Sequence, residues 1–184
     1  SNALDNQNQP FYHGLLVQLP LPDQVDKKRV LDHLPIHLDC DVLSGRSYQR
    51  FLDGSLVFPP VAGAIKAIVK QHRVDLSDKT IAVVGQGNLV GKPVTDWLQS
   101  LGIEPVIIDK ESKATLNDLR NADVIISGTG QPHLIKPDMI KSDCVIFDAG
   151  TSSSKGAVAG DVDPACAEKA SLASLVPGGI GPIT

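Results

Sequence analysis

Between residues 79 and 174, short apolar runs alternate with segments that have a helical pattern. The runs share β-branched residues at consecutive positions, and they cover residues 80–84, 106–108, 124–127 and 144–147. Such runs are typical of parallel strands that are covered on both faces of a sheet. Between the first two runs, apolar residues recur at i, i+3, i+4 and i+7, namely Val94, Trp97, Leu98 and Leu101. This spacing predicts a helix with Pro93 at its first position.

Shorter helices are predicted over residues 116–121, from Pro137 onward and over residues 164–170. Strands that alternate with helices through brief loops indicate a doubly wound parallel α/β sheet of the Rossmann type. The serine run 152–154 is too short for a linker, and we expect it to be a surface loop.

The first 60 residues have a different pattern. An apolar run over residues 14–19 predicts one strand, and a helix is predicted over residues 24–34. Residues 35–60 have the composition of a loop, and a predicted helix over residues 61–71 leads into the α/β region. Because one strand with one or two helices does not close a core, this part is interpreted as the remnant of a smaller α/β domain.

The pattern therefore predicts four segments. Ser-Asn-Ala at residues 1–3 is interpreted as a cloning remnant, and the absence of an initiator Met indicates a start inside a longer protein. Residues 4–60 form the partial N-terminal domain and residues 61–174 the Rossmann domain. Residues 175–184 form a C-terminal loop whose two prolines and three glycines predict a rigid backbone with exposed amides.

Composition narrows the range of partners. The chain has 184 residues, of which 42% are hydrophobic, and a formal net charge of -4 without a basic block. Nucleic acid is thus excluded as a partner, since phosphate neutralisation needs clustered Lys and Arg. No apolar run of 18 residues predicts a membrane span. Cys40, Cys144 and Cys166 lie far apart, and the five histidines lack metal-ligand spacing, so we expect no metal and a reducing, cytoplasmic location.

The strongest site signal is a glycine loop between the first predicted strand and its helix. It includes Gly85, Gln86, Gly87, Asn88, Val90 and Gly91. Its glycines permit a tight turn and a close approach of backbone N–H groups to a pyrophosphate, and the helix N-terminus adds partial positive charge. The spacing is G-x-G-x-x-x-G, not the commoner G-x-G-x-x-G, so an ordinary glycine turn is the alternative.

Asp109 follows the second predicted strand, where an acidic residue accepts hydrogen bonds from the adenosine ribose of NAD. A carboxylate there repels the 2′-phosphate of NADP, which favours NAD. Lys110 and Lys113 follow closely and can compensate, so NADP stays open, as does an exposed Asp without a ligand.

Turns after the third and fourth predicted strands supply further candidates. Gly128, Thr129 and Gly130 are expected to line the nicotinamide side of the same crevice, and Thr151 lies in the next turn. Each turn alone can equally be a plain turn. Asp39 and Asp41 flank Cys40 in the N-terminal part, and the residues alone favour solvated carboxylates over a pair that binds a polar heterocycle.

Several of these motifs resemble the bifunctional methylenetetrahydrofolate dehydrogenase/cyclohydrolase family from about Leu4 onward. The matching segments are residues 13–22 (HGLLVQLPLP), 39–41 (DCD), 90–93 (VGKP), 160–163 (GDVD) and 176–184 (VPGGIGPIT). The first and last are highly specific. The resemblance implies oxidation of 5,10-methylenetetrahydrofolate by a nicotinamide cofactor and hydrolysis of the 5,10-methenyl product to 10-formyltetrahydrofolate, in a homodimer with folate between two domains.

The resemblance also implies roles for individual residues. Gln18 matches the glutamine near the reacting centre, with Leu19 and Pro20 beside it, and Asp41 matches the aspartate that holds the pterin ring. The loop with Pro177, Gly178 and Gly179 matches the one beside folate and nicotinamide.

The chain departs from the family pattern at several positions. The catalytic lysine and its tyrosine neighbour belong upstream of position 4, and Lys27 and Lys28 lie too late in the chain to replace them. Val42 replaces a glycine, Pro59 and Pro60 replace a cysteine and a threonine, and Gln86 replaces an arginine. Loss of that arginine also favours NAD.

Three hypotheses follow. The first is a fragment of a working folate enzyme that binds the cofactor without turnover. The second is a non-enzymatic dinucleotide-binding relative that acts as a sensor or interaction subunit, which the substituted loops motivate. An unrelated Rossmann dehydrogenase is the third, against which the Gln18 and Pro177 motifs count.

Overall fold

The structure is a computed structural model that describes residues 12–55, 57–154, 157–174 and 176–184. The chain divides into two compact units, Ser1–Pro60 and Val61–Thr184. The predicted cloning remnant lies outside the described residues.

The second unit is built on a five-stranded parallel sheet with the strand order β2-β1-β3-β4-β7. Its strands are β1 (Ile81–Val84), β2 (Val106–Ile108), β3 (Val124–Ser127), β4 (Val145–Asp148) and β7 (Leu172–Ser174). The four predicted apolar runs are confirmed as the first four strands. Strand β7 was not predicted because three residues with a single large apolar side chain give too weak a pattern. The parallel order, with β1 between β2 and β3, is the doubly wound arrangement predicted from the sequence.

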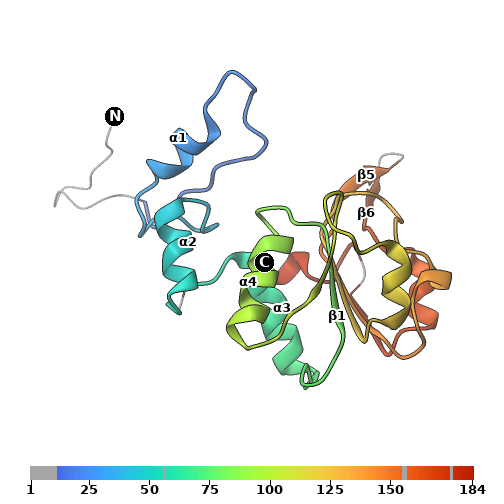
Figure 1. Cartoon of the computed structure of the whole chain (residues 1–184). Coiled ribbons are helices and arrows are strands. Elements are labelled where there is room, and N and C mark those ends of the chain that lie inside the picture. Colours follow the sequence, from blue (N-terminus) through green and yellow to red (C-terminus); the bar gives the residue numbers. More distant parts are fainter. Residues whose placement is uncertain (1–11, 56, 155–156, 175) are drawn as a thin grey trace. The chain divides into compact units, whose positions relative to one another are not determined.

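Helices cover both faces of this sheet (Figure 1). One side carries α3 (Pro60–Gln71) and α4 (Gly91–Ser100), and the other carries the 3-10 helices η1 (Leu116–Asn121) and η3 (Pro164–Glu168). The predicted helix at residues 61–71 is confirmed. Because α4 begins at Gly91, Pro93 is its third residue and not its first. The segment at Pro137 is also a 3-10 turn, η2 (Pro137–Met139), and a last one is η4 (Gly181–Ile183).

Alternate strand residues supply the core on each side of the sheet. On the η1 and η3 side, the packed cluster joins Leu119 and Cys166 to Ala82, Ile125 and Ile146, all at most 1% exposed. Residues one position along, such as Val83 and Ile126, are equally buried toward the other side. Burial of both faces explains why the strands are apolar at consecutive positions.

A two-stranded antiparallel ribbon, β5 (Ser152–Ser154) with β6 (Ala157–Ala159), extends from the same unit. The expectation of a surface loop at residues 152–154 is therefore wrong. Three serines lack the apolar alternation that marks a strand, and the ribbon forms through antiparallel backbone pairing. The Ser152 side chain adds one hydrogen bond, from its Oγ to the Ala159 carbonyl at 3.1 Å.

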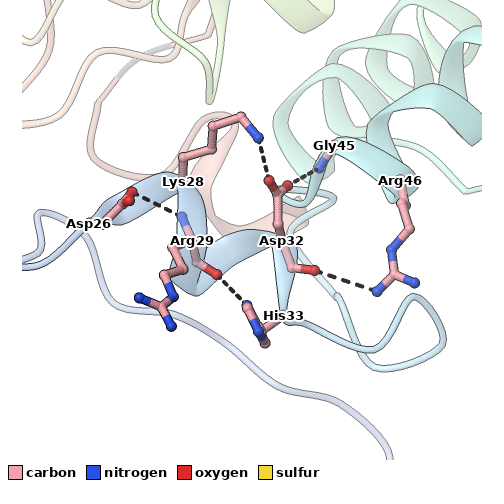
Figure 2. Close-up of polar contacts among 7 residues, drawn as sticks. All are labelled: Asp26, Lys28, Arg29, Asp32, His33, Gly45 and Arg46. Carbon is pink, nitrogen blue, oxygen red and sulfur yellow. Dashed lines mark hydrogen bonds and ion pairs between the residues drawn. The ribbon is translucent and has the colours of Figure 1, made fainter.

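The first unit contains two short helices, α1 (Lys27–Asp32) and α2 (Gly45–Leu52). Figure 2 shows how α1 begins: Asp26 accepts a hydrogen bond from the Arg29 N–H at 3.0 Å, as an N-cap residue does. The same view shows Asp32 accepting from the Gly45 N–H at 3.3 Å, which joins the end of α1 to the start of α2.

Three expectations for this unit are wrong. The helix predicted over residues 24–34 is confined to residues 27–32, since the Asp26 cap fixes its start. The strand predicted over residues 14–19 is reduced to one parallel bridge, Leu15 to Asp39, because the described residues offer it no longer partner. The segment expected to be a loop contains α2, whose apolar stripe of Tyr48, Phe51 and Leu52 spans a single turn and was too short to be recognised. Within the described ranges, no helix is long and apolar enough to cross a membrane.

Candidate functional site

The glycine loop turns sharply between β1 and α4. Gly85 has a φ of 89°, a backbone conformation that L side chains rarely adopt. A Cβ on Gly91 would lie 1.8 Å from the Gly85 carbonyl oxygen, so the start of α4 and the end of β1 approach too closely for any side chain there. By contrast, a Cβ on Gly87 would meet nothing within 4 Å. The loop therefore needs glycine at both ends, as the sequence predicted from a dinucleotide turn.

Gln86 is held inside this loop. Its Nε2 donates to the Thr95 Oγ1 of α4 at 3.0 Å and to the Gly85 carbonyl at 3.3 Å. Val90, the N-cap of α4, makes no side-chain capping bond. Lys92, the second residue of α4, donates its N–H to the Gly87 carbonyl at 3.2 Å, so the glycine turn itself takes up part of the helix N-terminus, whose partial positive charge lies beside it.

A cavity of about 630 Å³, named cavity A, opens at the carboxyl ends of β1, β2 and β3. It is lined by Val84, Gly85, Gln86, Gly87, Ile108, Asp109, Lys110, Glu111, Leu116, Gly128, Thr129, Gln131 and Leu134. Ligands of open α/β sheets bind at this edge, where the strand order reverses. The cavity joins a glycine turn, a carboxylate and apolar side chains, which suits the phosphate, ribose and base of a nucleotide.

Asp109 follows β2 and lies in the wall of cavity A, half-buried. Its Oδ1 accepts hydrogen bonds from the N–H groups of Glu111 at 2.9 Å and Ser112 at 2.6 Å. These bonds close the loop after β2 and fix the carboxylate. Lys110 and Glu111 line the same cavity, so two acidic residues and one basic residue lie there.

The turn after β3 forms the opposite wall of cavity A through Gly128, Thr129 and Gln131. A buried carboxylate, Asp161, accepts hydrogen bonds from the N–H groups of Thr129 at 2.6 Å and Gln131 at 2.9 Å. Sequence reasoning used Asp161 only as part of a family motif and assigned it no place near the site. Its position 30 residues away along the chain gives no local signal.

A second cavity of about 560 Å³, named cavity B, belongs to the same unit. Its lining includes Val61, Leu89, Val90, Asp148, Ala149, Thr151 and Val158, and the C-terminal residues Val176–Gly181, Pro182 and Thr184. The Val176–Pro177 peptide bond is cis. Burial raises the pKa of Asp148 above its ordinary value, against the effect of N–H donors from Val162, Asp161 and Gly150.

In the first unit, the two aspartates beside Cys40 differ. Asp39 is 5% exposed and accepts from the N–H groups of Leu43 at 3.1 Å and Ser44 at 2.8 Å, so the expectation that it is solvated is wrong. Asp41 is half-buried, and burial together with the nearby Asp39 charge raises its pKa. Gln18 is exposed, with its Nε2 donating to the Leu19 carbonyl at 3.0 Å, and the Leu19–Pro20 bond is cis.

The predicted residues therefore fall into groups. Cavity A is lined by Gly85, Gln86, Gly87, Asp109, Gly128 and Thr129, whereas Val90, Thr151, Pro177, Gly178 and Gly179 line cavity B. Neither lining includes Asn88, Gly91 or Gly130. Gln18, Leu19, Pro20 and Asp41 belong to the first unit. The described residues hold no group of three His, Cys, Asp or Glu arranged for a metal ion. Gln131, in the turn predicted to line the crevice, also lines cavity A, whereas Glu111, Leu116 and Leu134 line it without having been predicted as site residues.

Together, the parallel sheet, the glycine turn and cavity A define a Rossmann-type dinucleotide-binding unit. Residues 59–184 match the family model of the tetrahydrofolate dehydrogenase/cyclohydrolase NAD(P)-binding domain. The chain belongs to the tetrahydrofolate dehydrogenase/cyclohydrolase family, a family of bifunctional enzymes. The predicted family and the predicted α/β fold are confirmed.

Two curated relatives show the extent of the match. The chain is 35% identical over 186 residues to the bifunctional protein FolD of Lactobacillus acidophilus and 36% identical over 187 residues to bifunctional protein FolD 2 of Geobacter sulfurreducens. These alignments cover 100% and 99% of the chain and 66% of each relative. The chain thus spans slightly less than two thirds of the length of these relatives.

Solved structures agree. The bifunctional enzyme FolD of Campylobacter jejuni superposes with a TM-score of 0.85 at 31% identity, over 93% of this chain and 62% of that one. FolD of Trypanosoma brucei, solved in complex with NADP and an inhibitor, gives a TM-score of 0.83 at 27% identity over the same shares.

Proposed function

We propose that this chain supplies the dinucleotide-binding part of an enzyme that oxidises 5,10-methylenetetrahydrofolate and hydrolyses the methenyl product to 10-formyltetrahydrofolate. The observation that carries the proposal is cavity A, where the glycine turn, Asp109 and the turn after β3 converge. Family membership supplies the reaction. A bound nicotinamide cofactor would supply the hydride acceptor, and the protein must hold the two reacting rings face to face.

The chain's own residues take the following parts in this proposal. Gly85, Gly87 and Gly91 let the backbone approach the pyrophosphate with Gln86, Asn88 and Val90 around it, while Asp109 accepts from the ribose. Gly128, Thr129, Gly130 and Thr151 complete the cofactor site. Gln18, Leu19, Pro20, Asp41, Pro177, Gly178 and Gly179 bind the folate, with Gln18 and Asp41 nearest the reacting centre.

We propose NAD as the preferred cofactor. The lining of cavity A contains the Asp109 carboxylate and no arginine, and the Gln86 side chain is engaged with Thr95. A second negative charge beside Asp109 costs Coulomb energy that Lys110 alone offsets only in part. NADP binding requires that Lys110 and Lys113 outweigh this carboxylate.

The cyclohydrolase step needs a group with a tuned pKa to handle the proton of the attacking water. The first lysine of the sequence is Lys27, after Gln18, whereas the family resemblance puts the acid/base lysine before it. We therefore propose that these 184 residues bind cofactor and folate without turnover. We propose that residues 4–60 are the folate-binding part, that residues 61–174 are the cofactor-binding domain, and that residues 175–184 are the loop beside the substrate cleft.

The assembly proposed is a homodimer in the cytoplasm. The cytoplasmic assignment rests on the cysteines: all three are unpaired, two of them are buried, and burial raises the pKa of Cys166 to about 11. Size-exclusion chromatography with light scattering tests the dimer, and a monomer across the working concentration range contradicts it.

Folate binding tests the proposal directly. 5,10-Methylenetetrahydrofolate is titrated into the chain with and without NAD⁺, and formation of the 5,10-methenyl product is followed by absorbance. We expect binding without turnover, and Asp41→Asn should weaken folate binding by tenfold or more because it removes the charged acceptor at the ring. Asp23→Asn, at an exposed carboxylate of the same unit, is the matched control. Unchanged folate affinity in Asp41→Asn contradicts the role of Asp41, and absence of binding favours a non-enzymatic relative.

A further inference from the structure

Asp161 is a carboxylate that is fully buried, with 0% of its surface exposed, and yet it lines neither cavity A nor cavity B. Its two oxygens accept three hydrogen bonds. Oδ2 accepts from Ser127 Oγ at 2.7 Å and from the Thr129 N–H at 2.6 Å, and Oδ1 accepts from the Gln131 N–H at 2.9 Å. All three donors lie at the end of β3 or in the turn that follows it.

The backbone around Asp161 leaves the carboxylate little freedom. A Cβ on Gly150 would lie 2.1 Å from Oδ1, so the turn after β4 passes directly against it. The Asp161 N–H donates to Asp148 Oδ1 at 3.1 Å, and its carbonyl accepts from the Ile135 N–H at 3.0 Å. The Asp161 carboxylate is therefore held in place, because moving it requires displacement either of the end of β4 or of the segment after β3.

The turn that Asp161 holds is the wall of cavity A formed by Gly128, Thr129 and Gln131. Two of its backbone N–H groups point at the buried carboxylate and are satisfied by a charged acceptor, which gives the stronger class of hydrogen bond. Those groups are consumed by the protein and are not offered to a ligand. The turn thus keeps one shape before any ligand enters.

We propose that Asp161 is a positioning residue that fixes the turn 128–131 from behind and thereby sets the affinity of cavity A for the dinucleotide. This rests on the proposed function, since it assigns a support to the cofactor site. A preformed wall removes the ordering cost that binding would otherwise carry, so loss of the support weakens binding even though Asp161 touches no ligand.

The test uses Asp161→Asn in the whole chain. A carboxamide has one oxygen and one NH₂ group, so one of the two turn N–H groups must lose its bond to residue 161. The Gln131 N–H also has Thr129 Oγ1 as an acceptor at 3.2 Å, whereas the Thr129 N–H bonds Asp161 Oδ2 at 2.6 Å. Ser127 can reverse its hydroxyl, but a backbone N–H cannot. We expect NAD⁺ affinity to fall at least tenfold by calorimetry. Ser127→Ala is the matched control, because it removes one bond to the same carboxylate and leaves both turn N–H bonds, and its affinity should stay within threefold of wild type.

Amide hydrogen exchange separates positioning from general loss of structure. In Asp161→Asn, exchange at Thr129 and Gln131 should rise while the Gly85 N–H, bonded to the Ile108 carbonyl at 2.8 Å, stays protected. If the variant does not fold, exchange in the cofactor-free wild type still decides: protected Thr129 and Gln131 amides support the inference, and unprotected ones overturn it.

A folded Asp161→Asn chain that binds NAD⁺ as tightly as wild type overturns this inference alone. A wild-type chain that binds neither NAD⁺ nor NADP⁺ overturns the proposed function and, with it, the effect of Asp161 on affinity. The two failures are therefore distinguishable.

Discussion

Val42 occupies a position where the backbone is left-handed, with a φ of 56°, although its side chain is β-branched and only 2% exposed. The family resemblance places a glycine here, and the backbone keeps the conformation that glycine favours. A β-branched residue in this region carries strain of about 1–3 kcal/mol. Asp39 opposes it locally by holding the N–H groups of Leu43 and Ser44.

The strain at Val42 predicts that glycine is less destabilising than alanine at this position, the reverse of their usual order. Val42→Ala and Val42→Gly both lose buried methyl groups, but only glycine releases the left-handed strain, so the glycine variant should be more stable than the alanine variant by about 1 kcal/mol. The control is Ala67→Gly at an exposed position inside α3, where glycine should cost about 1 kcal/mol. Urea unfolding of all four chains measures this. An alanine variant at position 42 that is as stable as the glycine variant contradicts the strain.

Gly91 tests the geometry of the glycine turn. In Gly91→Ala the Cβ meets the Gly85 carbonyl oxygen, so the loop must shift, and we expect a loss of about 1–3 kcal/mol in stability. NAD⁺ binding should weaken at the same time. Gly87→Ala, where the new Cβ has open space, should change stability by less than about 0.5 kcal/mol. Equal melting temperatures for the two variants would show that the close approach is not required.

Whether the sequence predicted a helix or strand depends on how much apolar surface that element buries along its own residues. Strands β1 to β4 are buried on both faces, so consecutive β-branched residues marked them in the sequence. Strands β5 to β7 form through backbone pairing with little apolar surface, so they lack the apolar alternation that marks a strand. Helix α2 has the helical spacing of apolar residues only at Tyr48, Phe51 and Leu52, which is too short a stripe to be recognised. The opposite error occurred at residues 14–19, where an apolar run lacks the neighbouring strands that would make it a sheet.

The site divides in the same way. Gly85, Gly91 and Asp109 follow directly from strand ends, so the sequence could place them. Asp161 could not be placed, because its contacts with Thr129 and Gln131 join distant parts of the chain. The prediction that Asp39 is solvated was wrong for a related reason. Its carboxylate accepts hydrogen bonds from the N–H groups of Leu43 and Ser44, and these contacts depend on how the backbone turns after Asp39.

Asp123, at the start of β3, links elements through charge and is the natural probe of acid stability. A hydrogen bond from Lys141, another from the Thr80 N–H and the Lys141 charge hold its pKa below the ordinary value of 3.8. A carboxyl with a lowered folded-state pKa contributes stability that is present above its unfolded pKa and lost as the pH falls through the folded one.

Asp123→Asn should therefore lower the free energy of unfolding at neutral pH and reduce the loss of stability on acidification from about pH 5 to about pH 3. Thermal unfolding across this range measures both effects. Asp138→Asn, at an exposed carboxylate of the same unit, is the control. A variant whose acid profile parallels that of wild type would show that the Lys141 contact does not persist in solution.

At the scale of the whole molecule, the second unit contains all of the cofactor site residues that cavities A and B display. The sheet, the glycine turn and both cavities come from residues 61–184 alone. Dinucleotide binding by the chain should therefore not depend on the first-unit residues that we propose to bind folate.

The most direct test of this account is calorimetric titration of the 184-residue chain with NAD⁺ and, separately, NADP⁺. We expect binding of one dinucleotide per chain, with NAD⁺ at least tenfold tighter because the lining of cavity A includes the Asp109 carboxylate and no arginine. Tighter binding of NADP⁺ would show that Lys110 and Lys113 outweigh Asp109. Binding of neither dinucleotide would contradict the assignment of cavity A.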